Sequence, residues 1–423
     1  MKLLLKSIRI IDPNSPFNGK IKDIYIENGI IKNISENIPS DPDTTILDRL
    51  NQHVSIGWFD FKANFCDPGF EDKEDIESGS EAALYGGFTN VGLLPNTQPH
   101  ISKKSQVNYI NNKSANLIIK LHPYGTLSEE MKGKDLSELY DMTCAGALAF
   151  TDDKRYVQDS GLLQRALQYS NTFNSLIITF PDDPFLSAGG LMNEGELNYS
   201  LGLKPISRLA EEIGLKKHLS IASYNNCRIH ISGVSTKESI QLIRKAKSEG
   251  VKVTCDVAIA NLYFDENELV SFDSNYKVFP PLRTKNDIEE IERGLKDGTI
   301  DVICSDHTPI DIEGKKCEFD YAKPGIASIQ TTFSMLNEKL TSSFLLEEII
   351  LLITHNPRKV LNLPFNKIDI GQNADLTIFD PAFVWNYNLN NNKSKSINNP
   401  LIGRNIMGLA LAVVNKSSFK ILS

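Results

Sequence analysis

The chain has 423 residues, 41% of them hydrophobic and 23% charged, which is ordinary for a folded globular protein. This length is too great for one small domain and fits a barrel of roughly 250 residues with a smaller domain beside it. The net charge of −8, without a basic block, argues against a nucleic-acid or membrane partner, and no apolar run is long enough for a membrane span.

The first 50 residues are expected to form short strands and turns. The runs LLLKSIRIID, DIYIENG and GIIKNIS have the pattern of hairpin strands, and Asn28-Gly29 is a residue pair typical of a type I′ turn. The opening run also resembles the start of a signal peptide, but charged residues interrupt it early, which favours a strand. We therefore expect residues 1–52 to form the N-terminal part of a small β domain.

From about residue 54, apolar strands alternate with helical stretches. Near-continuous apolar runs are typical of parallel strands that are buried on both faces. Eight such units predict an α/β fold, a (β/α)8 TIM barrel over residues 53–365, with functional residues at the carboxyl ends of the strands. The expected strands are 54–60, 90–95, 117–122, 146–151, 175–180, 227–232, 251–256 and 301–305.

Short strands return after about residue 365, in DIGQNADLTIFD and MGLALAVVNKSSFKIL. We expect residues 366–423 to pair with the N-terminal segment and complete the small domain as a β-sandwich. Between these strands, NYNLNNNKSKSINNP (386–400) is rich in asparagine, a composition that predicts a solvated loop.

The six cysteines are scattered and form no CxxC pair. This pattern favours buried free thiols in a reducing compartment, so we expect a cytoplasmic protein.

Six motifs along the chain are distinctive. They are DPGFEDKEDIESGSEAALYGGFTNVGLLPNTQP (67–99), GLMNEGE (190–196), IHISGVSTKESIQLIRKAKSEGVKVT (229–254), KVFPPLRTKND (277–287), GTIDVICSDHTP (298–309) and GQNADLTIFDP (371–381). In this order they resemble the motifs of dihydroorotases, and the resemblance runs from end to end. It implies hydrolysis of dihydroorotate to N-carbamoyl-L-aspartate, or the reverse ring closure, in pyrimidine synthesis. It also implies one or two zinc ions that supply a hydroxide nucleophile and polarise the amide carbonyl.

The resemblance also implies a ligand set that this chain lacks. Relatives hold zinc on an HxH motif after strand 1, an acidic residue or carboxylated lysine after strand 4, histidines after strands 5 and 6, and a proton-shuttling aspartate after strand 8. No histidine lies between His122 and His218 to replace the strand 5 ligand, and His218 is expected on a surface helix. The corresponding positions here are Lys62 and Asn64, Asp152, Phe180, Gly233 and Asp306.

We therefore expect neither zinc nor another cofactor, because zinc prefers nitrogen and sulfur ligands around a tetrahedral ion. An oxygen-only magnesium or manganese site on Asp60, Asn64, Asp152 and Asp306 remains an alternative. We expect the Lys62 ammonium to lie within ion-pair distance of Asp306 or Asp152, in place of the missing metal charge. The alternative is a lysine that extends into solvent.

Substrate-binding positions differ as well. Asn96 of the PNT motif remains, either as a ligand-binding residue or as a cap at the strand end. His230 and His307 are expected to be hydrogen-bonded structural residues. The arginine, histidine and asparagine that bind substrate in relatives are replaced by Cys66, Ile310 and Phe279, and Cys66 is expected to be an inert thiol.

Three functions are compatible with this sequence. The first is a catalytically inactive dihydroorotase homologue that serves as a structural or assembly partner of aspartate transcarbamoylase, a role that only the resemblance implies. The second is an active cyclic-amide hydrolase with an altered metal site. The third is a small-molecule sensor that uses the emptied pocket. Homo-oligomers are common in the family, so an oligomer is also expected.

Overall fold

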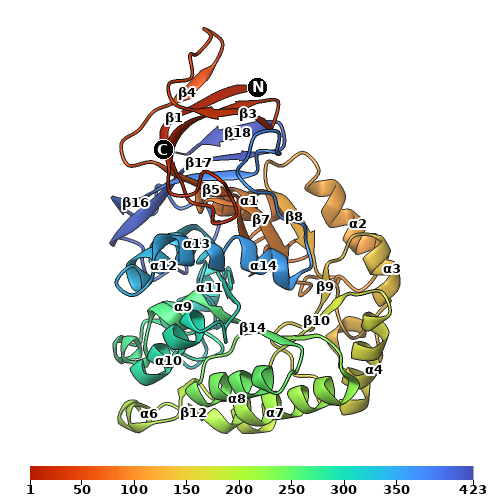
Figure 1. The fold of residues 1–423 in the computed structure, drawn as a ribbon. Helices are drawn as coiled ribbons and strands as arrows, with labels where there is room; N and C mark the ends of the chain where they lie inside the picture. Colours follow the sequence, from red (N-terminus) through yellow and green to blue (C-terminus); the bar gives the residue numbers. More distant parts are fainter. Residues whose placement is uncertain (423) are drawn as a thin grey trace.

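Eight short parallel strands close into a barrel (Figure 1). The structure is a computed structural model that describes residues 1–422. Hydrogen bonds join β6, β7 and β8 into one sheet and β9, β10, β13, β14 and β15 into another, and the bridges Gly125–Phe150 and Ala63–His307 connect the two. The predicted TIM barrel is therefore confirmed. Its strands are β6 (Trp58–Ala63), β7 (Phe88–Leu93), β8 (Lys120–Pro123), β9 (Ala149–Phe150), β10 (Leu176–Thr179), β13 (Ile229–Ile231), β14 (Val253–Ala258) and β15 (Val302–Cys304).

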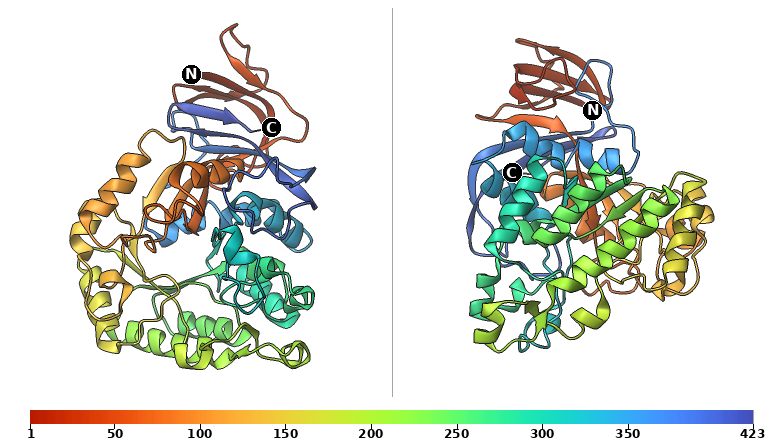
Figure 2. Two further views of the ribbon diagram at one scale, coloured as in Figure 1. Left: turned by 180° about the vertical axis from the view of Figure 1, so that it is seen from behind. Right: turned by 60° about the horizontal axis from the view of Figure 1, so that its bottom comes forward.

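Helices surround these strands (Figure 2). In α8 (Lys237–Ser248), Thr236 caps the first turn by accepting a hydrogen bond from the Ser239 amide, and Ile240, Ile243 and Ala246 are buried at helical spacing. The other helices of the ring are α1 (Ile76–Tyr85), α2 (Lys104–Lys113), α3 (Leu139–Cys144), α4 (Ser160–Asn171), α7 (Arg208–Asn225), α10 (Lys285–Lys296), α12 (Thr332–Leu340), α13 (Leu346–Leu352) and α14 (His355–Val360).

Shorter elements lie in the loops between the barrel strands. After β10 the chain makes an excursion through α5 (Pro184–Ser187), β11 (Met192–Asn193), α6 (Glu196–Leu201) and β12 (Pro205–Ile206). The remaining short helices are η1 (Glu129–Met131), α9 (Ile259–Tyr263), η2 (Glu266–Ser271), η3 (Ser274–Tyr276), α11 (Ile312–Lys315) and η4 (Ile329–Thr331).

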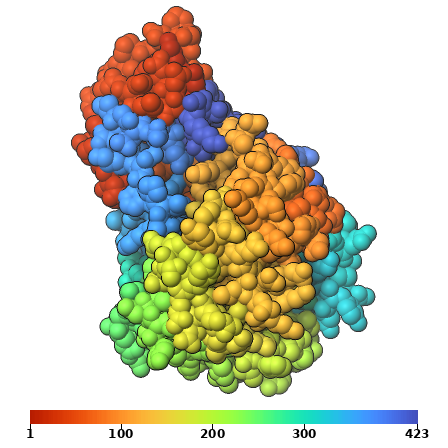
Figure 3. All heavy atoms as spheres, turned by 90° about the vertical axis from the view of Figure 1, so that its right-hand side faces the viewer, coloured from red at the N-terminus to blue at the C-terminus, as the bar shows by residue number. Residues whose placement is uncertain are grey.

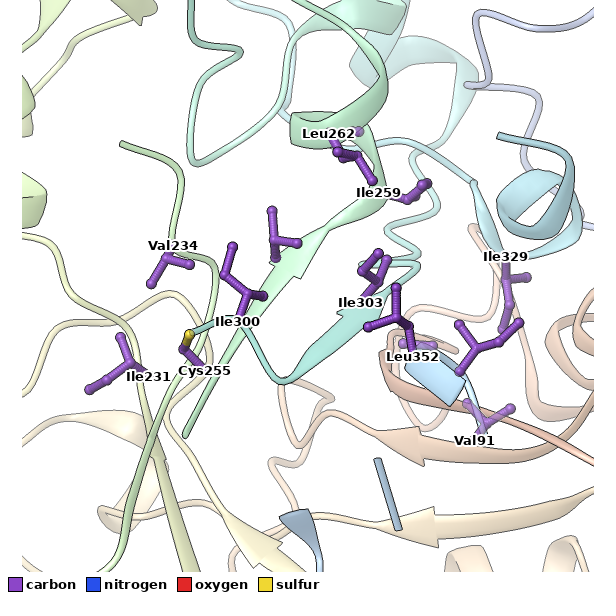
Figure 4. Close-up of a cluster of buried hydrophobic side chains, with 14 of the residues drawn as sticks. Val91, Ile231, Val234, Cys255, Ile259, Leu262, Ile300, Ile303, Ile329 and Leu352 are labelled. Atoms are coloured by element: carbon purple, nitrogen blue, oxygen red, sulfur yellow. The ribbon is translucent and has the colours of Figure 1, made fainter. Parts of the chain in front are cut away.

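Branched apolar side chains fill the layer between strands and helices (Figure 4). Cys255 lies among them, and burial raises the pKa of its thiol. Cys66, Cys227 and Cys304 are also buried free thiols, whereas Cys144 and Cys317 are exposed. The labelled members of this layer are Val91, Ile231, Val234, Ile259, Leu262, Ile300, Ile303, Ile329 and Leu352.

The first expected strand, 54–60, is divided at Gly57. Residues before it form β5 (His53–Ile56), which pairs with strands outside the barrel, and residues after it form β6. A β-carbon at Gly57 would lie 2.0 Å from Asp375 Oδ1, so the chain passes too close to that side chain for any larger residue. The single apolar run in the sequence hides this change of partner because both halves are buried.

Both chain ends contribute to the second part of the molecule, a sheet beside the barrel (Figure 1). Figure 3 shows residues from the two chain ends, in red and blue, gathered at one end of the molecule. Its order is β18-β17-β16-β5-β1-β2-β3, with β4 paired to β1. Apolar residues of the N-terminal strands and of β16 and β17 share one buried cluster, so neither segment has a complete core alone. The strands are β1 (Lys2–Ile10), β2 (Ile21–Glu27), β3 (Ile30–Ser35), β4 (Thr45–Leu47), β16 (Leu376–Asn386), β17 (Asn405–Asn415) and β18 (Ser418–Ile421). The domain boundaries at 52/53 and 365/366 stay predictions.

The prediction of a solvated loop at 386–400 is wrong for its second half. Ser394, Ser396, Asn398 and Asn399 are buried. The Asn398 side chain donates to the carbonyls of Thr308 and Gly325 and accepts from the Ile310 amide. Asparagine is as suited to pairing with buried backbone groups as to solvent, and composition does not distinguish the two. This segment, the 386–400 strap, crosses the loop that follows β15.

No helix within residues 1–422 is long and apolar enough to cross a membrane.

Candidate functional site at the barrel mouth

Lys62, the penultimate residue of β6, places its ammonium group inside the barrel mouth. Its side chain is 3% exposed. Nζ donates to Ser232 Oγ at 2.7 Å and lies 3.4 Å from Asp306 Oδ1 and 3.5 Å from Asp256 Oδ1. The expected ion pair with Asp306 is therefore confirmed, and the alternative of a lysine that extends into solvent is wrong.

Asp256, at the middle of β14, is the partner that the sequence did not indicate. Its Oδ1 also accepts from the Gly233 amide at 2.9 Å, and its Oδ2 lies 3.1 Å from His230 Nε2. His230 in turn contacts Thr254 through Nδ1, so it is a structural residue as expected. Burial opposes ionisation of Asp256, but the Lys62 charge and the His230 hydrogen bond outweigh burial and lower the pKa of its carboxyl group.

The Lys62 ammonium stays protonated in this setting. Burial alone would lower its pKa, but the charges of Asp256 and Asp306 raise the pKa well above its ordinary value. A protonated amine is neither a general base nor a metal ligand. The position that resembles the first zinc ligand therefore carries a fixed positive charge.

Asp306 forms a second ion pair that the sequence did not indicate. Its Oδ2 lies 2.8 Å from Lys154 Nζ, while its Oδ1 faces Lys62. Asp306 has a φ of 51°, in the left-handed region, so the backbone turns sharply where β15 ends. Lys154 directly follows Asp152-Asp153, and its place beside two carboxylates was the available signal.

Asp152 does not face Lys62, so the alternative ion pair expected for this lysine does not form. Its carboxylate accepts from the amides of Leu127 and Ser128 and from the Ser128 hydroxyl. Asp153, with a φ of 50°, turns toward the mouth instead and accepts from Asn96 Nδ2 at 3.0 Å. Asn96 thus has a structural partner, while its Oδ1 is buried without a hydrogen-bond partner among residues 1–422.

Phe180 and Gly233 occupy the positions after strands 5 and 6. Phe180 is buried against Phe279, with ring centroids 5.3 Å apart. Gly233 has a φ of 72°, and a β-carbon there would lie 3.0 Å from the Phe180 ring. Phe180 and Gly233 therefore fit together, and a histidine at residue 233 would crowd this ring and strain the left-handed backbone.

Four other singled-out residues have structural settings. Asn64 is buried, and its backbone amide donates to the His307 carbonyl. The His307 ring accepts from the Ile329 amide. Burial raises the pKa of the Cys66 thiol to about 12, which favours the expected inert thiol. His218, expected on a helix surface, is fully buried and stacked on Tyr156, because α7 turns that face toward the loop after β9.

Comparison with known proteins assigns the family. A "Dihydro-orotase-like" family model matches residues 53–239, and an "Amidohydrolase family" model matches residues 196–407. A protein named dihydroorotase from Syntrophus aciditrophicus is 36% identical over 411 residues, covering 96% of both chains. One from Ruminiclostridium cellulolyticum is 38% identical with the same coverage.

The chain belongs to the dihydroorotase-like family of amidohydrolases. Among solved structures, an L-hydantoinase (dihydropyrimidinase) from Arthrobacter aurescens has a TM-score of 0.85 at 20% identity and covers 100% of this chain and 97% of its own. That likeness supports the shared fold.

The residues of this family member do not fit the zinc that the family resemblance implies. Lys62 places a positive charge at a ligand position, and the side chains of Phe180 and Gly233 have no atom that can bind zinc. Within residues 1–422, no group of three or more histidine, cysteine, aspartate or glutamate side chains could hold a metal ion. The oxygen-only alternative does not gather either, since Asp152 faces Leu127 and Ser128, and both Asp60 oxygens accept from Ser305.

The family motifs that persist form a buried polar network away from Lys62. Arg283 of PPLR donates to Asn193 of MNEG at 2.8 Å and to Ser235 at 3.0 Å, and its guanidinium lies 3.3 Å from Glu211. Glu211 also accepts from the amides of Ser235 and Thr236. These contacts hold the excursion after β10 against α7 and α8. The fold alone thus accounts for retention of MNEG and PPLR.

Proposed function

We propose that this chain is a metal-free, catalytically inactive dihydroorotase homologue of pyrimidine biosynthesis, and that it serves as a structural partner of aspartate transcarbamoylase. The observation that carries the first half is the Lys62 ammonium between Asp256 and Asp306. Relatives that are 36–38% identical over nearly their full length are named dihydroorotase, which supports the pathway.

Inactivity follows from the charges that face the mouth. Attack on a cyclic amide needs a nucleophilic oxygen, and water has a pKa of about 15.7 until a metal lowers it to about 7. The Lys62 ammonium already holds its proton, and Asp256 and Asp306 are engaged by Lys62 and Lys154. No group here replaces the metal-generated hydroxide.

The test combines metal analysis with an assay of ring opening and ring closure. We expect less than about 0.1 equivalent of zinc, manganese or magnesium after purification, and no turnover of dihydroorotate or N-carbamoyl-L-aspartate with or without added zinc. The dihydroorotase of Syntrophus aciditrophicus, prepared in parallel, is the positive control. One equivalent of tightly bound metal, or turnover abolished by a chelator, would establish the active hydrolase instead.

The partner half of the proposal rests on the retained scaffold. Eight barrel strands and the Arg283 network persist without the ligand set, as expected when a surface rather than a reaction is required. We expect a complex with aspartate transcarbamoylase of the same source at micromolar concentration, measured by sedimentation velocity. The same experiment on the chain alone gives its oligomeric state. Unchanged sedimentation of both proteins in the mixture would contradict the partnership.

A further inference from the structure

A cavity of about 800 Å³ opens beside the buried cluster of Lys62, Asp256 and Asp306. It lies between residues 131–134, the loop after β9, and the start of the excursion after β10. Its walls include Lys132, Lys134, Lys154 and Arg155. This volume lies within the usual range for small-molecule sites. Four cations in one wall stand out on a chain whose net charge is −8.

Within residues 1–422, the carboxylates in this wall form no close ion pair with those cations, although Asp152 acts on Arg155 at longer range. Asp152 accepts hydrogen bonds from the amides of Leu127 and Ser128, and Asp182 accepts one from the Ser187 hydroxyl at 2.7 Å. Asp159 caps α4 and has only a long contact of 3.8 Å to Arg165, outside the cavity.

Two cations of the wall have no acidic partner. Among residues 1–422, neither Lys134 nor Arg155 has a carboxylate within ion-pair distance; Arg155 donates only to the Met131 carbonyl, through Nη1. Its remaining N–H donors are free to meet a ligand. Lys132 pairs with Glu130, and both side chains are about two-thirds exposed, so this ion pair contributes little stability.

A neighbouring cavity of about 520 Å³ extends the same wall. Lys132 and Arg155 line both cavities, and Lys103 adds a further cation. Two buried polar atoms of this second cavity, His100 Nδ1 and Gln106 Oε1, have no hydrogen-bond partner within residues 1–422. Buried polar groups normally have one, so unpaired atoms beside a cavity indicate a place for a polar ligand or water.

We propose that the larger cavity binds a small molecule carrying at least two negative charges, held by Lys134 and Arg155. A guanidinium group presents paired donors that match carboxylate and phosphate oxygens, and lysine adds a mobile point charge. Phosphate esters and dicarboxylates share this chemistry.

Lys154 connects this cavity to the buried cluster. It lines the cavity, and its Nζ lies 2.8 Å from Asp306 Oδ2, whose other oxygen faces Lys62. A bound anion therefore competes with Asp306 for Lys154. A ligand in the cavity thereby changes the charge balance at the Asp306–Lys62 ion pair, which makes this a ligand-sensing site. Binding of an anion here requires neither the absence of catalysis nor a protein partner.

Isothermal titration with inorganic pyrophosphate and with succinate, at fixed ionic strength, tests the site. We expect saturable binding of one or both, and the better probe tells whether phosphate or carboxylate chemistry is preferred. Arg155→Gln with Lys134→Gln should weaken binding at least about tenfold, whereas Lys245→Gln, on the exposed face of α8, should leave it unchanged. Circular dichroism and thermal midpoints establish that each variant is folded.

The connection through Lys154 has its own test. Asp306→Asn frees Lys154 from its competitor, so pyrophosphate affinity should rise about threefold or more, and this gain should vanish in a Lys154→Gln background. No saturable binding of either probe, or binding that the Arg155 and Lys134 substitutions leave unchanged, overturns the site. Equal affinity of Asp306→Asn and the parent overturns the connection, whatever the dihydroorotase assay or the sedimentation experiment reports.

Discussion

At the scale of single residues, one lysine side chain sets the electrostatics of the barrel mouth. Asp256 and Asp306 approach the same point from β14 and from the end of β15, and two unit charges about 4 Å apart interact by roughly 4 kcal/mol at an effective dielectric of 20. The Lys62 ammonium turns that repulsion into attraction. Its position is decisive because it stands where relatives carry a zinc ligand.

Replacing Lys62 by methionine should destabilise the fold by about 3–5 kcal/mol, because it leaves buried carboxylates without their partner. The stem length is preserved, so the loss reports the charge. Urea unfolding followed by circular dichroism measures it, and Lys245→Met, on the exposed face of α8, should change the free energy of unfolding by less than about 0.5 kcal/mol. If Lys62→Met is as stable as the parent, then protonation or hydration, and not the lysine charge, stabilises the carboxylates of Asp256 and Asp306.

At the scale of elements, the 386–400 strap shows how a polar segment becomes part of the core. Asn398 fills three backbone hydrogen-bonding positions in the loop after β15. Glu74 of the PGFEDKE motif accepts from the Lys395 amide at 3.2 Å and from the Ser394 hydroxyl, which ties the strap to the loop after β6. Motif and strap therefore stabilise each other.

Asn398→Ala should cost at least about 2 kcal/mol, because it leaves a buried amide and carbonyls unpaired. Asn390→Ala, at an exposed position of the same strap, is the matched control and should be close to neutral. Thermal or urea unfolding compares the two. Equal stability of both variants would show that the strap lies on the barrel without stabilising it.

Two buried lysines, Lys277 and Lys315, lie in the segments after β14 and β15. Lys315 is 7% exposed and donates to the Ser274 carbonyl at 2.8 Å, while Lys277 donates to the Phe319 carbonyl at 2.6 Å. Burial, with the nearby Lys277 charge, lowers the pKa of Lys315 to about 7.

Lys315 should make the stability of the fold depend on pH. An unfolded lysine has a pKa of about 10.4, so between about pH 7 and 10 the unfolded chain binds a proton that the folded chain lacks. The free energy of unfolding is therefore highest above the unfolded pKa. It decreases as the pH falls toward 7, by up to about 1.4 kcal/mol per pH unit, because the folded chain must keep this lysine neutral.

Lys315→Met should remove that slope, whereas Lys323→Met, at an exposed position, should keep it. Urea midpoints at pH 7, 8 and 9 measure the difference between variants. Identical slopes in the parent and in Lys315→Met would mean that the amine stays charged through its contacts with backbone carbonyls.

At the scale of the whole molecule, the barrel and the terminal sheet are joined by buried groups. Trp58, the first residue of β6, packs on Phe379 of β16 and on Phe333 of α12, with ring centroids 5.3 and 4.5 Å apart. Asp375 accepts from both Arg358 and Asn90. Aromatic packing and a shared carboxylate across the junction predict that the two parts unfold together.

The two tryptophans of the chain allow a direct test. Trp385→Phe leaves Trp58 to report on the barrel, and Trp58→Phe leaves Trp385 of β16 to report on the sheet. We expect the fluorescence midpoint of each variant in urea to coincide with its own far-ultraviolet circular dichroism midpoint. An earlier transition at Trp385 would show that the sheet unfolds while the barrel stays folded.

The sequence by itself determined the family, the barrel and the absence of the histidine ligands, because apolar periodicity and ordered motifs are local properties of the chain. It also indicated the Lys62–Asp306 pair, since the carboxyl ends of barrel strands meet at one face. Only the tertiary structure decided the other partners of Lys62. Ser232 is 170 residues away along the chain, and Asp256 further still. Left-handed backbone at Asp153 and Asp306 set the direction of the side chains there, and the Asn-rich strap is buried because distant backbone groups needed partners.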